Sequence, residues 1–291
     1  MAELFPLAAI TDEFSPDLET ATRSMAELGM RGAELRVVFG KNIIDLTDEE
    51  LARARAIVEA PGLQVISIAS PLLKCELPDA PPVDPRFQQD MFASNYTFSD
   101  QTRLARRAFE IASQTGARIV RVFSYWRTLQ PEACFERIVI ALRELADQAA
   151  QHDVIVGLEN EHACNISTGA ETARVLAAVD HPNLKVVWDP ANAFLSGEIP
   201  FPDGYGLLPV SRIVHVHAKD CLVRDHRPVW GPLGEGGVDW KGQIGALWDD
   251  GYRGFISLET HWGGPDSDKH LGSMICGRNL QALVASSPAH A

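Results

Sequence analysis

The chain has 291 residues, of which 46% are hydrophobic and 22% are charged, so it is long enough to bury a large core in one or two domains. Its formal net charge of −13 disfavours nucleic acid and anionic membranes as partners, because like charges repel. No apolar run approaches the roughly 18 residues of a membrane span, and the N-terminus lacks the basic segment of a signal peptide, so neither a membrane protein nor a secreted one is expected.

Short apolar segments alternate with helical segments along the whole chain. Helix starts are marked by Ser15 before Pro16 and by capping boxes that begin at Thr47 and Thr168. The eight predicted strands are residues 7–10, 32–38, 63–70, 118–123, 154–161, 184–192, 212–220 and 254–259. The predicted helical segments are residues 16–28, 48–60, 100–114, 131–152, 169–179, 193–195, 240–250 and 273–285.

Residues 74–100 form the one long irregular stretch, between the third predicted strand and the helix that follows it. Four prolines within positions 78–85 exclude regular structure at its start. Long loops in compact domains often serve as lids or interface arms. The stretch carries aromatic residues, which argue against disorder, so we expect it to cover the pocket or a neighbouring subunit. These aromatic residues are Phe87, Phe92, Tyr96 and Phe98.

Strict alternation of strand and helix predicts parallel pairing with right-handed crossovers. Eight such units predict an α/β fold of the (β/α)8 TIM-barrel type, with residues 1–291 as a single domain. An open doubly wound sheet is the alternative. The barrel is favoured because the strands carry polar side chains on one face, whereas strands of an open sheet are covered on both sides. No GxGxxG motif follows the first strand, which weakens a dinucleotide-binding fold further.

Residues 212–220 show the strand pattern most clearly, with three apolar side chains on one face and three polar ones on the other. The polar face carries His215, His217 and Lys219. Three other predicted strands also have a residue suited to metal binding or acid–base chemistry near their C-terminal ends. A single such residue is more often a hydrogen-bonded strand end, but four in sequence favour a site. The four residues are Glu159, Asp189, His217 and Glu259.

In a barrel, the C-terminal ends of the strands converge on one face, where catalytic residues lie. Three carboxylates and one imidazole suit a single divalent cation, for which we favour Mn²⁺, Mg²⁺ or Co²⁺ and also admit Zn²⁺ and Fe²⁺. Such a cation also explains how three buried carboxylates tolerate one another. Four protein ligands leave two octahedral positions, which the adjacent hydroxyl and carbonyl oxygens of a sugar can fill.

That geometry predicts a reaction class. A cation that holds these two oxygens stabilises an enediolate, while a neighbouring carboxylate removes the proton from carbon. Glu159 and Glu259 come from strands separated by two others, so we expect them to flank the substrate as an acid–base pair. One base that returns the proton gives isomerisation, and two opposed groups give epimerisation. A leaving group β to the carbanion gives dehydration or elimination instead.

Six motifs resemble those of the xylose isomerase-like TIM-barrel superfamily of sugar isomerases and epimerases. The similarity extends over essentially the whole chain and includes ketose 3-epimerases, inosose dehydratases and, more distantly, endonuclease IV. The motifs are GAELR (32–36), LEN (158–160), WDPAN (188–192), HVHAKD (215–220), GEGGVDW (234–240) and SLETH (257–261). The resemblance implies the four strand-end residues as metal ligands, with Glu159 and Glu259 as the acid–base pair.

Two further positions follow from the ketose epimerase pattern, and we assign both to the substrate side. An arginine shortly after the metal-binding histidine binds substrate in that pattern, and Arg224 is the nearest match, at a different offset. A histidine three residues after the aspartate also belongs to it, but this sequence has Asn192 there. Together with the net charge and the missing Asp-x-His motif, Asn192 argues against endonuclease IV activity.

Other candidates for substrate binding have a structural alternative of similar weight. His162 follows the strand-five glutamate and either reaches the substrate or caps its loop. Lys219 either binds an oxyanion or pairs with an acid, and Trp126 either stacks on a sugar face or packs in the core. We interpret Glu34 and Arg36 as a structural ion pair. We interpret His215 as a hydrogen-bonded core residue, and expect His261 and Trp262 to form a wall of the pocket.

The sequence thus supports three hypotheses. The first is a metal-dependent isomerase or epimerase of a small ketose or related sugar. The second is a lyase that uses the same site. Such a lyase is either a dehydratase of a keto-sugar or keto-inositol, or a β-eliminating enzyme that acts on a 3-keto-glycoside. The third is a non-catalytic sugar-binding barrel. The expected partner is a small carbohydrate, and a homo-oligomer is compatible with the sequence. The five cysteines, odd in number and without CxxC spacing, are typical of reduced thiols in a cytoplasmic protein.

Overall fold

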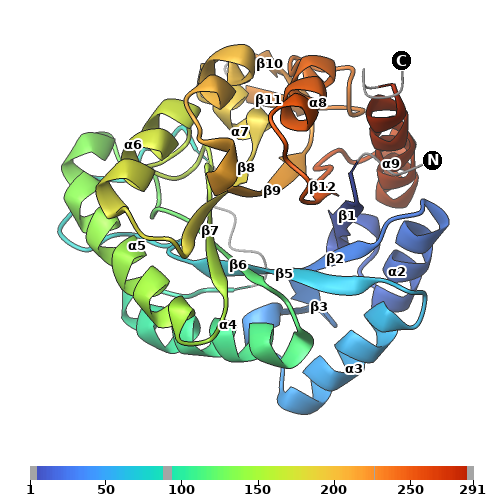
Figure 1. Ribbon diagram of the computed structural model, residues 1–291, viewed down its shortest axis with the longest axis horizontal. Coiled ribbons are helices and arrows are strands. Elements are labelled where there is room, and N and C mark those ends of the chain that lie inside the picture. Colours follow the sequence, from blue (N-terminus) through green and yellow to red (C-terminus); the bar gives the residue numbers. More distant parts are fainter. Residues whose placement is uncertain (1–4, 88–93, 226, 287–291) are drawn as a thin grey trace.

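The computed structural model describes residues 5–87, 94–225 and 227–286. Its parallel strands close into a barrel in the order β1-β12-β9-β8-β7-β6-β5-β2, with helices around the outside (Figure 1). The predicted (β/α)8 barrel is thus confirmed. The barrel strands are β1 (Leu7–Ile10), β2 (Gly32–Leu35), β5 (Gln64–Leu72), β6 (Ile119–Val122), β7 (Ile155–Glu159), β8 (Leu184–Trp188), β9 (Ile213–Ala218) and β12 (Ile256–Leu258).

The helices start where the sequence offers hydrogen-bond partners for their first backbone N–H groups. At Thr47 and Thr168 both halves of a capping box form, as predicted. Gly116, with a φ of 79°, takes the left-handed conformation that ends α4. The α-helices are α1 (Thr11–Phe14), α2 (Leu18–Glu27), α3 (Asp48–Glu59), α4 (Gln101–Thr115), α5 (Phe135–Ala150), α6 (Gly169–Val179), α7 (Pro190–Leu195), α8 (Trp240–Asp249) and α9 (Lys269–Ala285).

Most predicted strands are shorter in the structure, and two of them end three or four residues before their predicted ends. The one predicted at 32–38 leaves the barrel after Leu35, and Val37–Val38 (β3) pairs instead with Lys41–Asn42 (β4) in a small antiparallel hairpin. The turn between them has positive φ angles at Phe39 and Gly40, 54° and 74°, which suit a tight hairpin. This turn was not predicted, because residues with a preference for strands surround it.

The strand predicted at 184–192 ends at Trp188, because Asp189 caps α7 and Pro190 occupies the first helical turn. After β9 the structure also contains a hairpin in a segment for which no strand was predicted, formed by β10 (Cys221–Arg224) and β11 (Arg227–Trp230).

The first part of the 74–100 loop is attached to the segment that follows β6. The Asp84 N–H donates to the Arg127 carbonyl at 2.8 Å, and the Leu129 N–H donates to the Pro82 carbonyl at 2.9 Å. Residues 88–93, with Phe92, lie outside the described residues. The predictions that this loop covers the pocket and that the domain takes in residues 1–291 stay predictions.

Apolar side chains on the outer face of the barrel pack under the helices, as Val156, Leu158 and Val216 do, and each is fully buried. Burial of one such side chain contributes about 1.5–3 kcal/mol, so this layer stabilises the fold strongly. The inside of the barrel instead contains buried polar groups, among them Arg121 and His215. None of the described helices is long and apolar enough to cross a membrane.

Candidate metal centre

Four side chains from strand ends meet at the C-terminal end of the barrel. Glu159 ends β7, Asp189 follows β8, His217 lies in β9 and Glu259 follows β12. One ligand atom of each lies within 4.8 Å of the others, and all four residues are buried. The four strands are neighbours in the barrel, in the order β12-β9-β8-β7. The structure therefore brings together the residues predicted from the strand ends, and their role as metal ligands stays a prediction.

Three hydrogen bonds hold Asp189 in place. Its N–H donates to Asn160 Oδ1 at 2.8 Å, and Asn160 Nδ2 donates to the Asp189 carbonyl at 2.8 Å. Asn160 thereby ties the end of β7 to the end of β8 and joins the LEN and WDPAN motifs. On the side chain, Asp189 Oδ1 accepts a hydrogen bond from the Asn192 N–H at 2.9 Å. That bond occupies Oδ1 and leaves Oδ2 for the cluster.

Asp220 organises the segment that follows β9. Its carboxylate accepts hydrogen bonds from the N–H groups of Gly234, Gly236 and Val238, at 3.0, 3.0 and 3.2 Å. A Cβ at position 236 would lie 2.1 Å from Asp220 Oδ1, so glycine is required there. These bonds link the HVHAKD and GEGGVDW motifs, and so fix the backbone next to Lys219.

Protein cations accompany the carboxylates of the cluster. Lys219 Nζ lies 2.7 Å from Asp189 Oδ2 and 2.7 Å from Glu259 Oε2. Arg121 Nη1 lies 3.2 Å from Glu159 Oε2 and 3.9 Å from Glu259 Oε1. The acid-pairing alternative for Lys219 is therefore what the geometry shows, with partners that come from two other strands.

The three acids of the cluster differ in their pKa. Burial raises the pKa of Asp189 to about 6, although Lys219 opposes the rise. Burial also acts to raise the pKa of Glu259, but Lys219 and His217 hold it well below its ordinary value. For Glu159, His217 and Arg121 likewise outweigh burial, so its pKa is lowered. Both glutamates are therefore ionised at neutral pH and can accept a proton.

Two carboxylate oxygens in the cluster retain unused lone pairs. Glu159 Oε2 and Asp189 Oδ2 are buried and accept no hydrogen bond from the described residues. Arg121 and Lys219 approach them at ion-pair distance, but without the geometry of a hydrogen bond. Buried carboxylate lone pairs beside an imidazole nitrogen are the donor set that divalent cations bind in proteins. The residues therefore fit a divalent cation.

His162 and Asn192 lie next to the cluster and contact each other. His162 Nδ1 lies 2.8 Å from Asn192 Oδ1 and 2.8 Å from Glu161 Oε1. Asn192 Nδ2 donates to Glu159 Oε1 at 3.4 Å. Burial acts to lower the pKa of His162, but Glu161 outweighs it and raises this pKa above the ordinary value. A chain of polar groups thus extends from Glu159 to an imidazole that is only partly buried.

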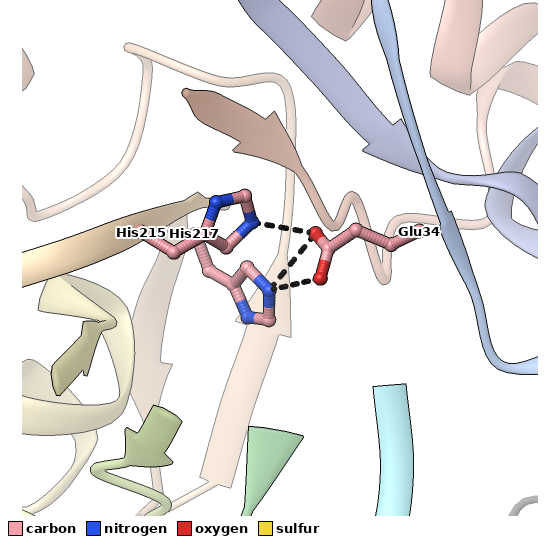
Figure 2. Close-up of side chains that lie close together, drawn as sticks. All are labelled: Glu34, His215 and His217. Atoms are coloured by element: carbon pink, nitrogen blue, oxygen red, sulfur yellow. Dashed lines mark hydrogen bonds and ion pairs between the residues drawn. The ribbon is translucent and has the colours of Figure 1, made fainter. Parts of the chain in front are cut away.

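The interpretation of Glu34 and Arg36 as an ion pair is wrong. Glu34 Oε1 lies 2.8 Å from His215 Nε2 and 3.1 Å from His217 Nε2 inside the barrel (Figure 2). Arg36 follows the end of β2 and pairs instead with Glu259 at 3.0 Å, with Asp12 at 2.8 Å and with Glu13. Because β2 ends between the two residues, their side chains reach different levels of the barrel.

The remaining substrate-binding candidates, Trp126 and Arg224, make no side-chain hydrogen bond or ion pair with the cluster in the described part of the chain. Trp126 is 3% exposed and packs with Phe123 and Cys164 in a small apolar group. Arg224 is exposed at the end of β10, and none of its hydrogen bonds or ion pairs to the described residues reaches the cluster. Their roles in substrate binding stay predictions.

The sequence reading missed two residues near the site. Arg121 had a signal, because an arginine interrupts the apolar strand Ile119–Val122. Trp230 had none, because no strand was predicted in the segment that carries it. Its ring stacks on His261, with centroids 4.8 Å apart, and lies 5.8 Å from Lys219 Nζ. Trp230 and His261 thus form an aromatic wall beside Lys219.

Residues 23–275 match the family described as xylose isomerase-like TIM barrel, and the chain belongs to this family. Among curated proteins, it is similar to an inosose dehydratase of Lacticaseibacillus casei, with 25% identity over 143 residues. That match takes in 43% of this chain and 47% of the relative, so it spans about half the length of the curated protein.

Two solved structures illustrate the shared fold. One is a xylose isomerase-like TIM barrel protein from Mycobacterium smegmatis in complex with magnesium, with a TM-score of 0.69, 19% identity and 100% of both chains covered. The other is a D-allulose 3-epimerase from Methylomonas sp. in complex with D-allulose, with a TM-score of 0.67, 18% identity and 97% of both chains covered.

Proposed function

We propose that this protein is a divalent-metal-dependent isomerase or epimerase of a small carbohydrate that carries a hydroxyl group next to a carbonyl. The observation that carries this proposal is the buried cluster of Glu159, Asp189, His217 and Glu259 at the C-terminal end of the barrel. Sugar binding alone does not require two ionised glutamates from strands that are separated by two others. The epimerase and the magnesium complex among the structural neighbours support the proposal.

A bound divalent cation would polarise the carbonyl and stabilise the negative charge that develops when the neighbouring carbon loses its proton. Glu259 is proposed as one proton acceptor, because the positive charge of Lys219 beside it acts to lower its pKa and so keeps it ionised at neutral pH. Glu159 is proposed as the group that exchanges a proton on the other side of the substrate. Lys219, between Asp189 and Glu259, offers a positive charge to a substrate oxygen.

His162 and Asn192 are proposed to bind the substrate. Asn192 occupies the position of a histidine in ketose epimerases, and in this chain an imidazole is supplied from the neighbouring loop by His162. The 2.8 Å contact between His162 Nδ1 and Asn192 Oδ1 orients that ring. Its Nε2 is then available for a sugar hydroxyl.

A lyase on the same site is the second candidate. His162 favours it, because an imidazole with a raised pKa can protonate a departing hydroxyl group. The similarity to an inosose dehydratase also favours it. In either case the expected substrate is a small carbohydrate. The described cysteines are all buried and free, which supports a reducing compartment such as the cytoplasm.

Adding a divalent cation is expected to stabilise the chelator-treated protein. A cation at about 100 times its dissociation constant contributes about 2.7 kcal/mol, because only the folded chain assembles the four ligands. For a chain of this length that corresponds to a rise in Tm of roughly 4–5 °C. Differential scanning fluorimetry with Mn²⁺, Mg²⁺, Co²⁺ and Zn²⁺ measures the shift. The same cations should leave the Tm of His217→Ala unchanged, and an equal shift in that variant would contradict the site.

The reaction class is tested with a panel of keto-sugars and keto-inositols in D₂O. Isomerisation or epimerisation is expected to add one deuterium and keep the carbon skeleton and its oxygens, which mass spectrometry and NMR detect. Loss of water would instead identify the lyase. Binding without any exchange, across substrates that raise the Tm, would support a non-catalytic sugar-binding barrel and overturn both enzymatic candidates.

A further inference from the structure

His217 presents its two ring nitrogens to different carboxylates. Nδ1 faces the candidate metal centre, 3.1 Å from Glu159 Oε1 and 3.4 Å from Glu259 Oε2. Nε2 faces the other way, deeper in the barrel, and lies 3.1 Å from Glu34 Oε1. Figure 2 shows this second contact, in which Glu34 reaches across the barrel from β2 toward β9. The ring is fully buried, so these carboxylates define its surroundings.

Glu34 is itself held by neighbours on two strands. His215, also on β9, places Nε2 2.8 Å from Glu34 Oε1. Ser257, on β12, donates its hydroxyl hydrogen to the same oxygen. Glu34 is fully buried, and its carboxylate therefore has a fixed position from which to accept a hydrogen bond.

A neutral imidazole has one N–H group and one lone pair, so it binds a cation through one nitrogen and donates from the other. We propose that Glu34 is a positioning residue for the metal centre: it accepts the Nε2–H of His217 and so commits the Nδ1 lone pair to the cation. A carboxylate that orients a metal-bound histidine in this way is a common arrangement in metalloproteins. The inference rests on the proposed metal site and adds a residue from the opposite side of the barrel.

Glu34, His215 and His217 also form a group that could hold a cation of its own. Hydrogen bonds account for that group without one, because Glu34 Oε1 already meets both Nε2 atoms at 2.8 and 3.1 Å. His217 also belongs to both groups, and its single lone pair serves only one of them. The carboxylate oxygens without a hydrogen-bond donor, Glu159 Oε2 and Asp189 Oδ2, lie on the Nδ1 side. Of the two groups that share His217, the structure therefore favours the one with Glu159, Asp189 and Glu259 as the cation site.

The first test measures cation affinity in Glu34→Gln. Glutamine keeps the size of the side chain, but it replaces a charged acceptor by a neutral one, which accepts weaker hydrogen bonds. We expect the dissociation constants for Mn²⁺ and Zn²⁺ to rise about 10–100-fold, as measured by competition with a chelating dye. The matched control is Ser67→Ala, a buried neighbour of Glu34 in the β2–β5 register whose hydroxyl has no hydrogen-bond partner among the described residues. The control is expected to keep the wild-type affinity within about twofold.

The second test uses the wild-type chain, so it does not depend on the folding of a variant. The protein is labelled with ¹⁵N-histidine and loaded with ¹¹³Cd²⁺, and the His217 signals are assigned by their loss in His217→Ala. We expect a one-bond ¹¹³Cd coupling at Nδ1 and a retained proton on Nε2. A proton on Nε2 shows that this nitrogen donates toward Glu34. If Glu34 had a purely structural role, it would not determine which ring nitrogen of His217 carries the proton.

The outcomes separate this inference from the proposed function. A wild-type protein that binds no cation overturns the proposed metal site and the inference with it. Cation coupling at Nε2, a cation bound by Glu34, His215 and His217, or an unchanged affinity in folded Glu34→Gln overturns the role of Glu34 alone. Weaker binding in Glu34→Gln but not in Ser67→Ala, with coupling at Nδ1, supports it.

Discussion

Replacement of Glu259 by glutamine is expected to slow the exchange of the substrate C–H group with solvent by about 10²–10⁴-fold, because an amide cannot accept the proton. The barrel should stay folded, since Lys219 retains Asp189 at 2.7 Å and Arg36 retains Asp12 at 2.8 Å. Deuterium incorporation into the substrate found in the panel, followed by mass spectrometry, measures the rate. Circular dichroism and metal analysis on the same sample show whether the fold and the cation remain.

Glu144→Gln is the matched control, because Glu144 is exposed on α5, on the outside of the barrel. It removes the same charge and should exchange at the wild-type rate. An unchanged rate in metal-loaded Glu259→Gln would remove Glu259 from the mechanism. Loss of the cation together with the rate would instead show that Glu259 acts mainly as a ligand.

Replacement of Arg121 by methionine is expected to lower the free energy of unfolding by about 3–5 kcal/mol in the presence of a chelator. Arg121 is 1% exposed and lies 3.2 Å from the buried Glu159, which would keep its charge but lose this counter-ion. Urea denaturation monitored by circular dichroism measures the change. A saturating divalent cation should restore part of the loss, because it would supply positive charge next to the same carboxylate.

Arg106→Met is the control for this experiment. Arg106 is 72% exposed and lies 4.0 Å from Glu110 on α4, so its ion pair is worth about 0–1 kcal/mol. A loss in Arg121→Met no larger than in this control would show that His217 alone neutralises Glu159. A loss that no cation restores would place Arg121 in the folding of the barrel but not in the electrostatics of the metal centre.

The positively charged side chains around the cluster affect how the protein responds to removal of a bound cation by a chelator. Lys219 and Arg121 already lie beside the three carboxylates, at 2.7 and 3.2 Å from their nearest oxygens. They lower the cost of burying negative charge when no cation is bound. We therefore expect chelator treatment to remove activity while the barrel stays folded, and the stabilisation by added metal to be a binding effect on an intact fold.

The sequence by itself determined the barrel and the identity of the strand-end cluster. Alternation of short apolar strands with capped helices predicts parallel pairing, and period-two patterning shows which side chains face inward. That reasoning placed Glu159, Asp189, His217 and Glu259 at one end of the barrel, where the structure brings them together. It works because the face of a strand residue depends only on neighbouring positions in the chain.

Only the tertiary structure decided which charged groups inside the barrel become partners. Glu34 contacts His215 and His217, and not Arg36, because barrel closure brings β2 across from β9. The contact between Trp230, on the β10–β11 hairpin, and His261 could not be predicted from the sequence either. Such contacts join residues far apart in sequence, and their geometry depends on strand register and on the depth of each residue in the barrel. Periodicity along one segment specifies the face of a side chain, but neither its depth nor its partner.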